Sequence, residues 1–339
     1  TRPTRRTCLA VILRTIDAHA AGGPLRLVVD GFPAPRGKTM LEKQEWANRN
    51  ADDVRRALIL EPRGHADMLG GVLTESATPG AHAGLLFFHN HGYSSMSGHG
   101  TIAAATIAIE RGLVMPGGDG TAIVFDTPAG TVRTRVAIIG AKVDHVTLTN
   151  VPAFVLYAGV PVQIGPRHLR ADVAYGGSFY AIVDAEAAGL SIDMAHVPEL
   201  RRMGVAIRDG VGRAVNVVHP SQPSLTGLDG TIFTGPPHEG GADLRNALVF
   251  ADGAVDRSPG GTGTSAVMAV LDAMGLLGED RPFVHESLLG TRFSGSVCGR
   301  TQVGEYPALV TEIEGSAWIT GEHTFVLDDS DPWRLGFRS

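Results

Sequence analysis

One pattern occurs twice in the chain: a short glycine-rich turn that runs directly into an apolar, alanine-rich stretch of helical length. The first copy has the turn SGHGT at 97–101 and the stretch 102–113, and the second has GGTGTS at 260–265 and 266–277. A Ser or Thr in each turn can cap a helix, and Gly-Leu stands near the end of both stretches. We therefore predict two lobes of similar plan, each contributing one helix N-terminus, with the boundary near residues 130–150.

Two such helix starts, facing each other, predict a site for a small carboxylate. A helix N-terminus has free backbone N–H groups and partial positive charge, and glycine lets a ligand approach these groups closely. Each turn alone is also typical of an ordinary glycine-rich helix start, and it is their repetition that favours a ligand site. No Gly-Lys-Ser or Gly-Lys-Thr follows either turn, so neither is a phosphate-binding P-loop.

Two ionisable residues stand beside these turns. His99 lies inside the first turn, where it could donate a hydrogen bond to a ligand, accept a proton, or have a purely structural role. Asp256 lies just before the second turn, where it could bind the ammonium group of the same ligand or form a salt bridge in a surface turn. An anion site next to a cation site would suit an amino acid.

Composition limits the classes of protein to consider. The chain has 339 residues, with 29 Lys+Arg against 35 Asp+Glu, and its formal charge of −6 argues against a nucleic-acid partner. No apolar run reaches the roughly 18 residues of a membrane span, and 8–13 is too short for a secretory signal. Cys8 and Cys298 are too few for a disulfide framework or a zinc site. We expect a cytoplasmic enzyme or binding protein without a metal, with Cys298 buried in a strand.

Most apolar runs are short and rich in Val, Ile and Thr, which is typical of strands, and few are long enough for helices. The expected strands are 25–29, 84–88, 122–125, 132–139, 143–149, 179–183, 205–207, 247–250 and 311–320. The expected helices are 40–60, 102–113, 265–277 and a short one at 198–203. Many strands with few helices predict an α+β architecture.

A series of motifs in a fixed order resembles the proline racemase superfamily, which includes proline racemase, 4-hydroxyproline 2-epimerase and trans-3-hydroxy-L-proline dehydratase. The motifs are TIDAH at 15–19, GGPLR at 22–26, EPRGHADM at 61–68, HNHGYS at 89–94, MSGHGT at 96–101, YGGSFY at 175–180, DRSP at 256–259, HES at 285–287 and WITG at 318–321. They span nearly the whole chain, and the ordered set is far more specific than any single motif.

The resemblance implies a diaminopimelate-epimerase-like fold of two pseudo-symmetric lobes, each a curled sheet around a central helix, with the ligand between them. The first lobe would comprise 1–135 together with the end of the chain from about 318 to 339, and the second 136–317. The resemblance also implies a small proline-type substrate, a homodimer, and no metal, nicotinamide or pyridoxal phosphate as cofactor.

The resemblance further implies roles for individual residues. Backbone N–H groups would hold the substrate carboxylate, His99 and Asp256 the ring nitrogen, and Leu69 and Phe250 would form walls. The residues that match the carboxylate-binding N–H groups are Gly98, His99, Gly261 and Thr262. His65 and Asp67 are expected either to line the pocket and help a hydroxyl leave, or to form a hydrogen-bonded turn.

Racemases and epimerases of the superfamily place one cysteine on each face of the α-carbon, and both cysteines are replaced here. Ser97 stands at the first position and Gly260, which has no side chain, at the second. Inversion needs proton chemistry on both faces, whereas dehydration needs one base and a leaving hydroxyl. Ser97 is the candidate base, which His99 could assist because a serine hydroxyl alone is a poor base.

These departures favour dehydration of trans-3-hydroxy-L-proline to Δ1-pyrroline-2-carboxylate. The alternatives are a proline racemase, a 4-hydroxyproline 2-epimerase, another reaction on a proline-like acid, and a binder of proline derivatives without catalysis. The binder would be stabilised by its ligand but would give neither product nor exchange of the α-proton.

Overall fold

The computed structural model describes residues 11–115, 121–238, 240–278 and 281–338. The elements before residue 150 are β1 (Val11–Ala20), β2 (Gly23–Asp30), α1 (Met40–Asn50), α2 (Asp52–Ile59), β3 (Leu69–Thr74), β4 (Ala83–His89), β5 (Gly92–Ser94), α3 (Gly98–Glu110), β6 (Ala122–Thr127), β7 (Gly130–Ile139) and β8 (Lys142–Thr149). The elements after it are β9 (Ala153–Ile164), β10 (Arg167–Tyr175), β11 (Phe179–Asp184), the 3₁₀ turn η1 (Met194–His196), α4 (Val197–Ala214), β12 (Val218–His219), β13 (Gln222–Thr226), β14 (Gly230–Gly235), β15 (Leu244–Phe250), β16 (Ala254–Val255), α5 (Gly261–Ala273), β17 (Phe283–Glu286), β18 (Arg292–Val303), β19 (Tyr306–Gly315) and β20 (Ala317–Leu327).

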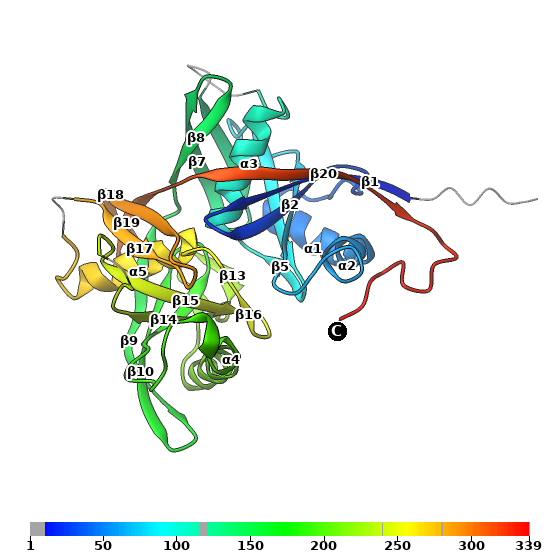
Figure 1. Ribbon diagram of the computed structural model, residues 1–339. Helices are drawn as coiled ribbons and strands as arrows, with labels where there is room; N and C mark the ends of the chain where they lie inside the picture. The colour runs from blue at the N-terminus through cyan, green and yellow to red at the C-terminus, as the bar shows by residue number, and fades with distance from the viewer. Residues whose placement is uncertain (1–10, 116–120, 239, 279–280, 339) are drawn as a thin grey trace, which may run out of the picture.

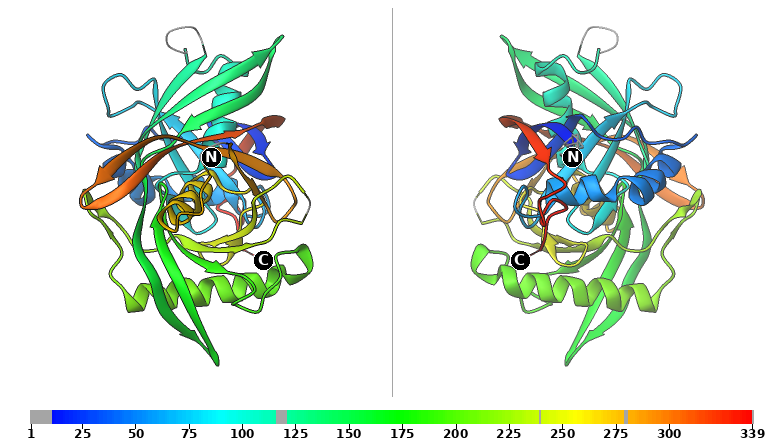
Figure 2. Two further views of the ribbon diagram at one scale, coloured as in Figure 1. Left: turned by 90° about the vertical axis from the view of Figure 1, so that its left-hand side faces the viewer. Right: turned by 90° about the vertical axis from the view of Figure 1, so that its right-hand side faces the viewer.

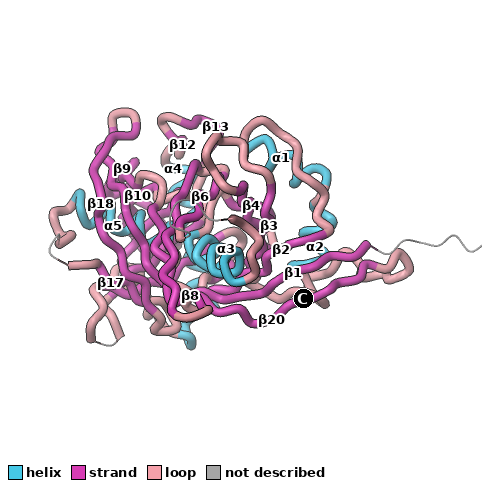
Figure 3. Tube along the Cα trace, turned by 90° about the horizontal axis from the view of Figure 1, so that it is seen from above, coloured by secondary structure: helices cyan, strands magenta, loops and turns pink. Residues whose placement is uncertain are grey.

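Two apolar helices, α3 and α5, form the centres of two lobes (Figure 1). α3 packs against β1, β2, β3, β7, β8 and β20, whereas α5 packs against β9, β10, β11, β18 and β19. Both helices are buried on nearly all sides, as expected of helices that are apolar around their whole circumference. Figure 3 shows the strands that lie around α3. The fold is therefore α+β with two similar lobes, as the sequence predicts.

The strands connect these lobes into one structure. In the described part of the chain, all strands except β12 and β13 belong to one 18-stranded sheet. β19 pairs with β18 and also with β8 and β9, so it links strands around both central helices. β20 then runs antiparallel along the whole of β1 (Figure 1), which places the C-terminal strand beside the N-terminal one. The lobe boundary near residue 135 stays a prediction.

Helix α4 corrects one expected strand. It runs horizontally through the lower part of both views in Figure 2 and packs on β9, β14 and β15. Leu200, Met203, Ile207 and Val211 are buried along one face of the helix, because their spacing follows its period. The predicted strand at 205–207 is therefore wrong, and the helix expected at 198–203 continues to Ala214.

Three further expectations need correction. The helix expected at 40–60 is two helices, because the backbone leaves the helical conformation at Ala51. The strand expected at 311–320 is the end of β19 and the start of β20, separated by Ser316. Cys298 is exposed on β18 rather than buried, and its thiol donates a hydrogen bond to the Val310 carbonyl. Cys8 lies outside the described residues.

Candidate functional site

The N-termini of α3 and α5 meet between the lobes at two glycines. A Cβ added to Gly98 would overlap the Cα of Gly261, and a Cβ added to Gly261 would lie 2.8 Å from the Cα of Gly98. Only glycine permits two backbones to approach so closely. The free N–H groups and positive ends of both helices therefore converge on one place, which is suited to an anion.

A small cavity lies beside this contact, and most of the residues that the sequence singled out line it. Leu69 and Phe250 form apolar walls, and Phe250 packs its ring against the edge of His89 at a centroid distance of 5.8 Å. The other predicted residues that line the cavity are Ser97, Gly98, His99, Asp256, Gly260, Gly261 and Thr262. The fold thus brings residues from both glycine turns and from two strands into one site.

Ser97 caps helix α3 from an extended backbone conformation. Its Oγ accepts a hydrogen bond from the Gly100 N–H at 3.2 Å, and the residue is 8% exposed. The Ser97 hydroxyl is not hydrogen-bonded to His99 in the described structure, so direct assistance by His99 is not part of this geometry. Because Oγ acts as an acceptor towards the helix, its own proton can point to a ligand or be lost.

His99 and Asp256 link the two lobes directly. The His99 Nδ1 lies 3.1 Å from the Asp256 Oδ2, and both residues are more than nine-tenths buried. Asp256 Oδ1 also accepts hydrogen bonds from the backbone N–H and the hydroxyl of Ser258, at 2.8 and 2.9 Å. Burial opposes ionisation of Asp256, but His99 and Ser258 outweigh it and hold the pKa below its usual value. Asp256 is therefore a carboxylate at neutral pH.

Gly260 lines the same cavity without a side chain. Its φ of 73° lies in the left-handed region, and its N–H donates to the Ser258 hydroxyl at 3.1 Å. A Cβ built there would lie 3.5 Å from the Asp256 Oδ2 and 3.3 Å from the Leu248 Cδ2, so a side chain would point towards the site. Any residue other than glycine would be strained by this backbone.

The structure adds cavity residues that the sequence reasoning did not assign. The Tyr180 hydroxyl and the Thr262 Oγ1 lie 2.7 Å apart in a buried hydrogen bond at the start of α5. Asp229 lines the same cavity, and burial raises the pKa of its carboxyl although Ser178 and Arg208 oppose the shift. The other such residues are Ser94, Met96 and Leu248. Tyr180 belongs to the YGGSFY motif, which was the one signal that could have identified it.

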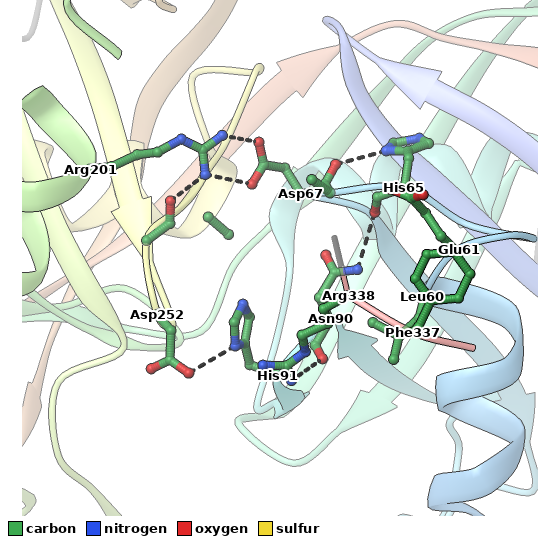
Figure 4. Close-up of a pocket in the computed structure, with 13 residues that line it drawn as sticks. Leu60, Glu61, His65, Asp67, Asn90, His91, Arg201, Asp252, Phe337 and Arg338 are labelled. Atoms are coloured by element: carbon green, nitrogen blue, oxygen red, sulfur yellow. Dashed lines mark hydrogen bonds and ion pairs between the residues drawn. The ribbon is translucent and has the colours of Figure 1, made fainter. Parts of the chain in front are cut away.

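His65 and Asp67 lie in a different cavity between the lobes, which Arg201 also lines, rather than in the cavity of Ser97 (Figure 4). His65 is exposed, and its Nδ1–H donates to the carbonyl of the adjacent Ala66 at 2.7 Å. Asp67 forms an ion pair with Arg201 of helix α4, with one contact at 2.9 Å. The structure therefore gives both residues the turn or inter-lobe contacts instead of a place beside Ser97.

No cluster of three or more His, Cys, Asp or Glu residues within the described ranges could hold a metal ion. None of the helices in the described ranges is long and apolar enough to cross a membrane.

A fold of two similar lobes, with a polar site where two central helix starts meet, defines proteins of the diaminopimelate-epimerase-like class. Within that class, the family model for proline racemase matches residues 15–338, and the chain belongs to this family.

Relatives in the family have different reactions in their names. A trans-3-hydroxy-L-proline dehydratase from Bacillus cereus is 41% identical over 326 residues, which cover 96% of this chain and 98% of that protein. A proline racemase from Clostridioides difficile is 40% identical over 326 residues, covering 96% of this chain and 97% of that protein. The crystal structure of a hydroxyproline epimerase from Agrobacterium vitis with bound trans-4-hydroxy-L-proline has a TM-score of 0.89 and 30% identity, and covers 96% of this chain and 95% of that chain. The reaction of this chain must therefore be argued from its own site.

Proposed function

We propose that the chain is a cofactor-independent dehydratase that converts trans-3-hydroxy-L-proline into Δ1-pyrroline-2-carboxylate and water. The observation that carries the proposal is the contrast between Ser97 and Gly260, which line the same cavity. Ser97 presents a hydroxyl, whereas Gly260 presents no side chain. Removal of the α-proton followed by departure of the C3 hydroxyl needs a protein group on one face only. Racemisation or epimerisation would need an acid on the Gly260 face as well.

The two helix starts suit the substrate carboxylate. Backbone N–H groups at Gly98, His99, Gly261 and Thr262 would donate to it, and the positive helix ends would stabilise the negative charge that spreads into it as the α-proton leaves. The ionised Asp256, with His99 beside it, would hold the ring nitrogen of the substrate as a secondary ammonium.

Ser97 is the proposed base. The hydrogen bond from the Gly100 N–H to Oγ and the positive end of α3 both favour the anionic form of the hydroxyl. The local structure thus offsets part of the weakness of serine as a base. The same contact fixes the position of Oγ relative to the carboxylate-binding N–H groups.

An NMR assay in D₂O tests the reaction. Trans-3-hydroxy-L-proline, trans-4-hydroxy-L-proline and L-proline are incubated separately with the protein, and products and α-deuterium are followed. We expect only the 3-hydroxy substrate to be lost, with a pyrroline carboxylate as its product. Inversion with α-deuterium in either other tube would identify a racemase or epimerase instead. Thermal stabilisation without product or exchange would identify a binder.

A matched pair of variants tests the role of Ser97. Ser97→Ala removes the proposed base and also a helix cap, so we expect product formation to fall by at least about 100-fold, in line with the loss of a general base. Thr39→Ala removes the cap of α1 away from the site and is expected to cost about 1 kcal/mol of stability with normal activity. An unchanged rate in Ser97→Ala would exclude serine as the base.

A further inference from the structure

A second cavity adjoins the candidate site at Asp229. It has a volume of about 200 Å³ and lies where helix α1 and strand β5 face the segment 224–229. Asp229 lines this cavity and also the cavity of Ser97 and Gly260. Asp229 therefore borders both the reaction site and a separate polar space.

The second cavity has room for water beside two tyrosines. Tyr175 is 2% exposed, and its hydroxyl has no hydrogen-bond partner among the described residues. The hydroxyl of Tyr93, which lines the same cavity, is also buried without a partner in the described part of the chain. Buried polar groups in proteins are nearly always satisfied, by ordered water where no protein group is available. The cavity is large enough for several water molecules.

Hydroxyl groups connect this cavity to Asp229. Ser178 hydrogen-bonds to the Asp229 carboxyl group, and its Oγ lies 3.0 Å from the Oγ of Ser95, which lines the second cavity. Ser95 donates its one hydroxyl proton to the Gly177 carbonyl at 2.8 Å, so this hydroxyl must turn towards Ser178 before a proton can pass to Asp229. A serine hydroxyl can donate and accept at once, so a proton can move along such a chain when the hydroxyls rotate.

The environment of Asp229 favours its protonated form. Burial raises the pKa of this carboxyl, and the hydrogen bond from Ser178 and the charge of Arg208 only partly oppose the shift. Asp256, in the same cavity, is held as a carboxylate. Two carboxyl groups with opposite shifts in one site have the arrangement expected of an acid and an anion with different tasks.

We propose that Asp229 is the catalytic acid for the leaving hydroxyl, and that Ser178 and Ser95 return a proton to it from water in the second cavity. The inference rests on the proposed dehydration. Ser97 takes the α-proton, and the electron pair of that C–H bond forms the C2=C3 bond. The C3–O bond breaks with its pair on oxygen, which takes the proton of Asp229 and leaves as water.

The proton balance closes over one turnover. The Asp229 carboxylate regains a proton from water through Ser95 and then Ser178. Ser97 takes the α-proton as its alkoxide and afterwards releases that proton to solvent, which restores the alkoxide. The enamine product moves its N–H proton to C3 through solvent and becomes Δ1-pyrroline-2-carboxylate. One substrate therefore gives one product and one water, with no oxidant or reductant. Ser178 and Ser95 act through Asp229 and are positioning residues.

Asp229→Asn tests the acid, because the amide keeps the shape of the side chain but lacks the transferable proton. With trans-3-hydroxy-L-proline in D₂O, we expect kcat to fall by about 100-fold or more. The recovered substrate should carry deuterium at the α-carbon, because the α-proton is still removed and returned. A normal kcat, or a parallel loss of product and α-exchange, would overturn the proposal. A wild-type protein that forms no product overturns the proposed function itself, and the role of Asp229 with it.

Ser95→Ala tests the proton path, and Ser224→Ala is its control, because Ser224 lines the same cavity outside the hydroxyl chain. We expect Ser95→Ala to lower kcat about 5-fold with unchanged KM and to change the solvent isotope effect on kcat, since proton transfer then limits turnover. Ser224→Ala should match the wild type in all three quantities. Equal behaviour of the two variants would overturn the path through Ser95.

Discussion

The start of α3 and the start of α5 touch each other, but they are held in place by different means. At α3, Ser97 has an extended backbone and its side chain accepts from the Gly100 N–H. At α5, Gly260 has a φ of 73° and no side chain, and the preceding loop holds it instead through the Ser258 hydroxyl. Asp256 in turn accepts two hydrogen bonds from Ser258, so hydrogen bonds within the loop 256–260 hold its conformation.

This contrast separates two properties of the site. Both starts offer backbone N–H groups to an anion, and that property depends only on glycine and helix geometry. Only the α3 start adds a side chain that can take a proton. A site of this kind can therefore keep the binding of a carboxylate while the chemistry at its two faces changes independently.

Gly98→Ala should have the largest effect, because it separates the two starts. Its Cβ would overlap the Cα of Gly261, so the helices must move apart and the shared anion site is lost. We expect kcat/KM to fall by at least about 100-fold and the protein to lose several kcal/mol of stability, as overpacking of two backbones predicts. Enzyme assays and thermal unfolding measure both quantities.

Gly212→Ala in helix α4 is the control for Gly98→Ala, because a Cβ at Gly212 meets no atom within 4 Å. It should leave activity normal and raise stability slightly, since alanine favours helix over glycine. Near-normal activity in Gly98→Ala would show that the close contact of the two starts is not needed for catalysis.

Gly260→Ala and Gly260→Cys give the α5 start a side chain. Both should lower stability by about 1–2 kcal/mol, because an L-residue is strained at this φ. Only the cysteine supplies an acid on this face, so only Gly260→Cys should produce deuterated D-proline from L-proline in D₂O. If Gly260→Cys gives no inversion, a missing acid on this face is not what limits the chain to one-sided chemistry.

The sequence predicted those elements that depend on interactions between residues close together in the chain. The two glycine turns and their apolar helices could be predicted because glycine and apolar content act within a few residues. The helices begin inside the turns, however, at Gly98 and Gly261, and only the first has a side-chain cap, since Gly260 stands at the cap position of the second. The strand expected at 205–207 failed because three apolar residues fit a strand, whereas the helical period is visible only over 200–211. The pairing of β20 with β1 depends on long-range contacts that no local pattern specifies.

The candidate site also divides into residues that local patterns predict and residues that only long-range contacts bring together. Asp229 could not be placed near Tyr180 from local patterns, because their proximity comes from the parallel pairing of β11 with β14, in which Tyr180 lies opposite Gly230. His65 was expected to line the pocket as part of the EPRGHADM motif. Asp67, two residues later, forms an ion pair with Arg201, and all three residues line a different cavity between the lobes. Residues within one turn were predictable, and residues joined by sheet register were not.

The two lobes also invite a comparison of two buried histidines, with the smallest expected effect. Burial lowers the pKa of His89 on β4 to about 3, together with His91 and nearby arginines, and burial lowers that of His285 on β17 to about 3. The unfolded chain therefore binds more protons below pH 6.5, and stability is lost as the pH falls through this range. Between pH 7 and pH 6, each of these two histidines should lower the free energy of unfolding by about 0.7 kcal/mol. Urea unfolding should show this loss reduced by about 0.7 kcal/mol in His285→Gln, but unchanged in the exposed control His168→Gln. Equal losses in both variants would mean that His285 is not buried in its neutral form.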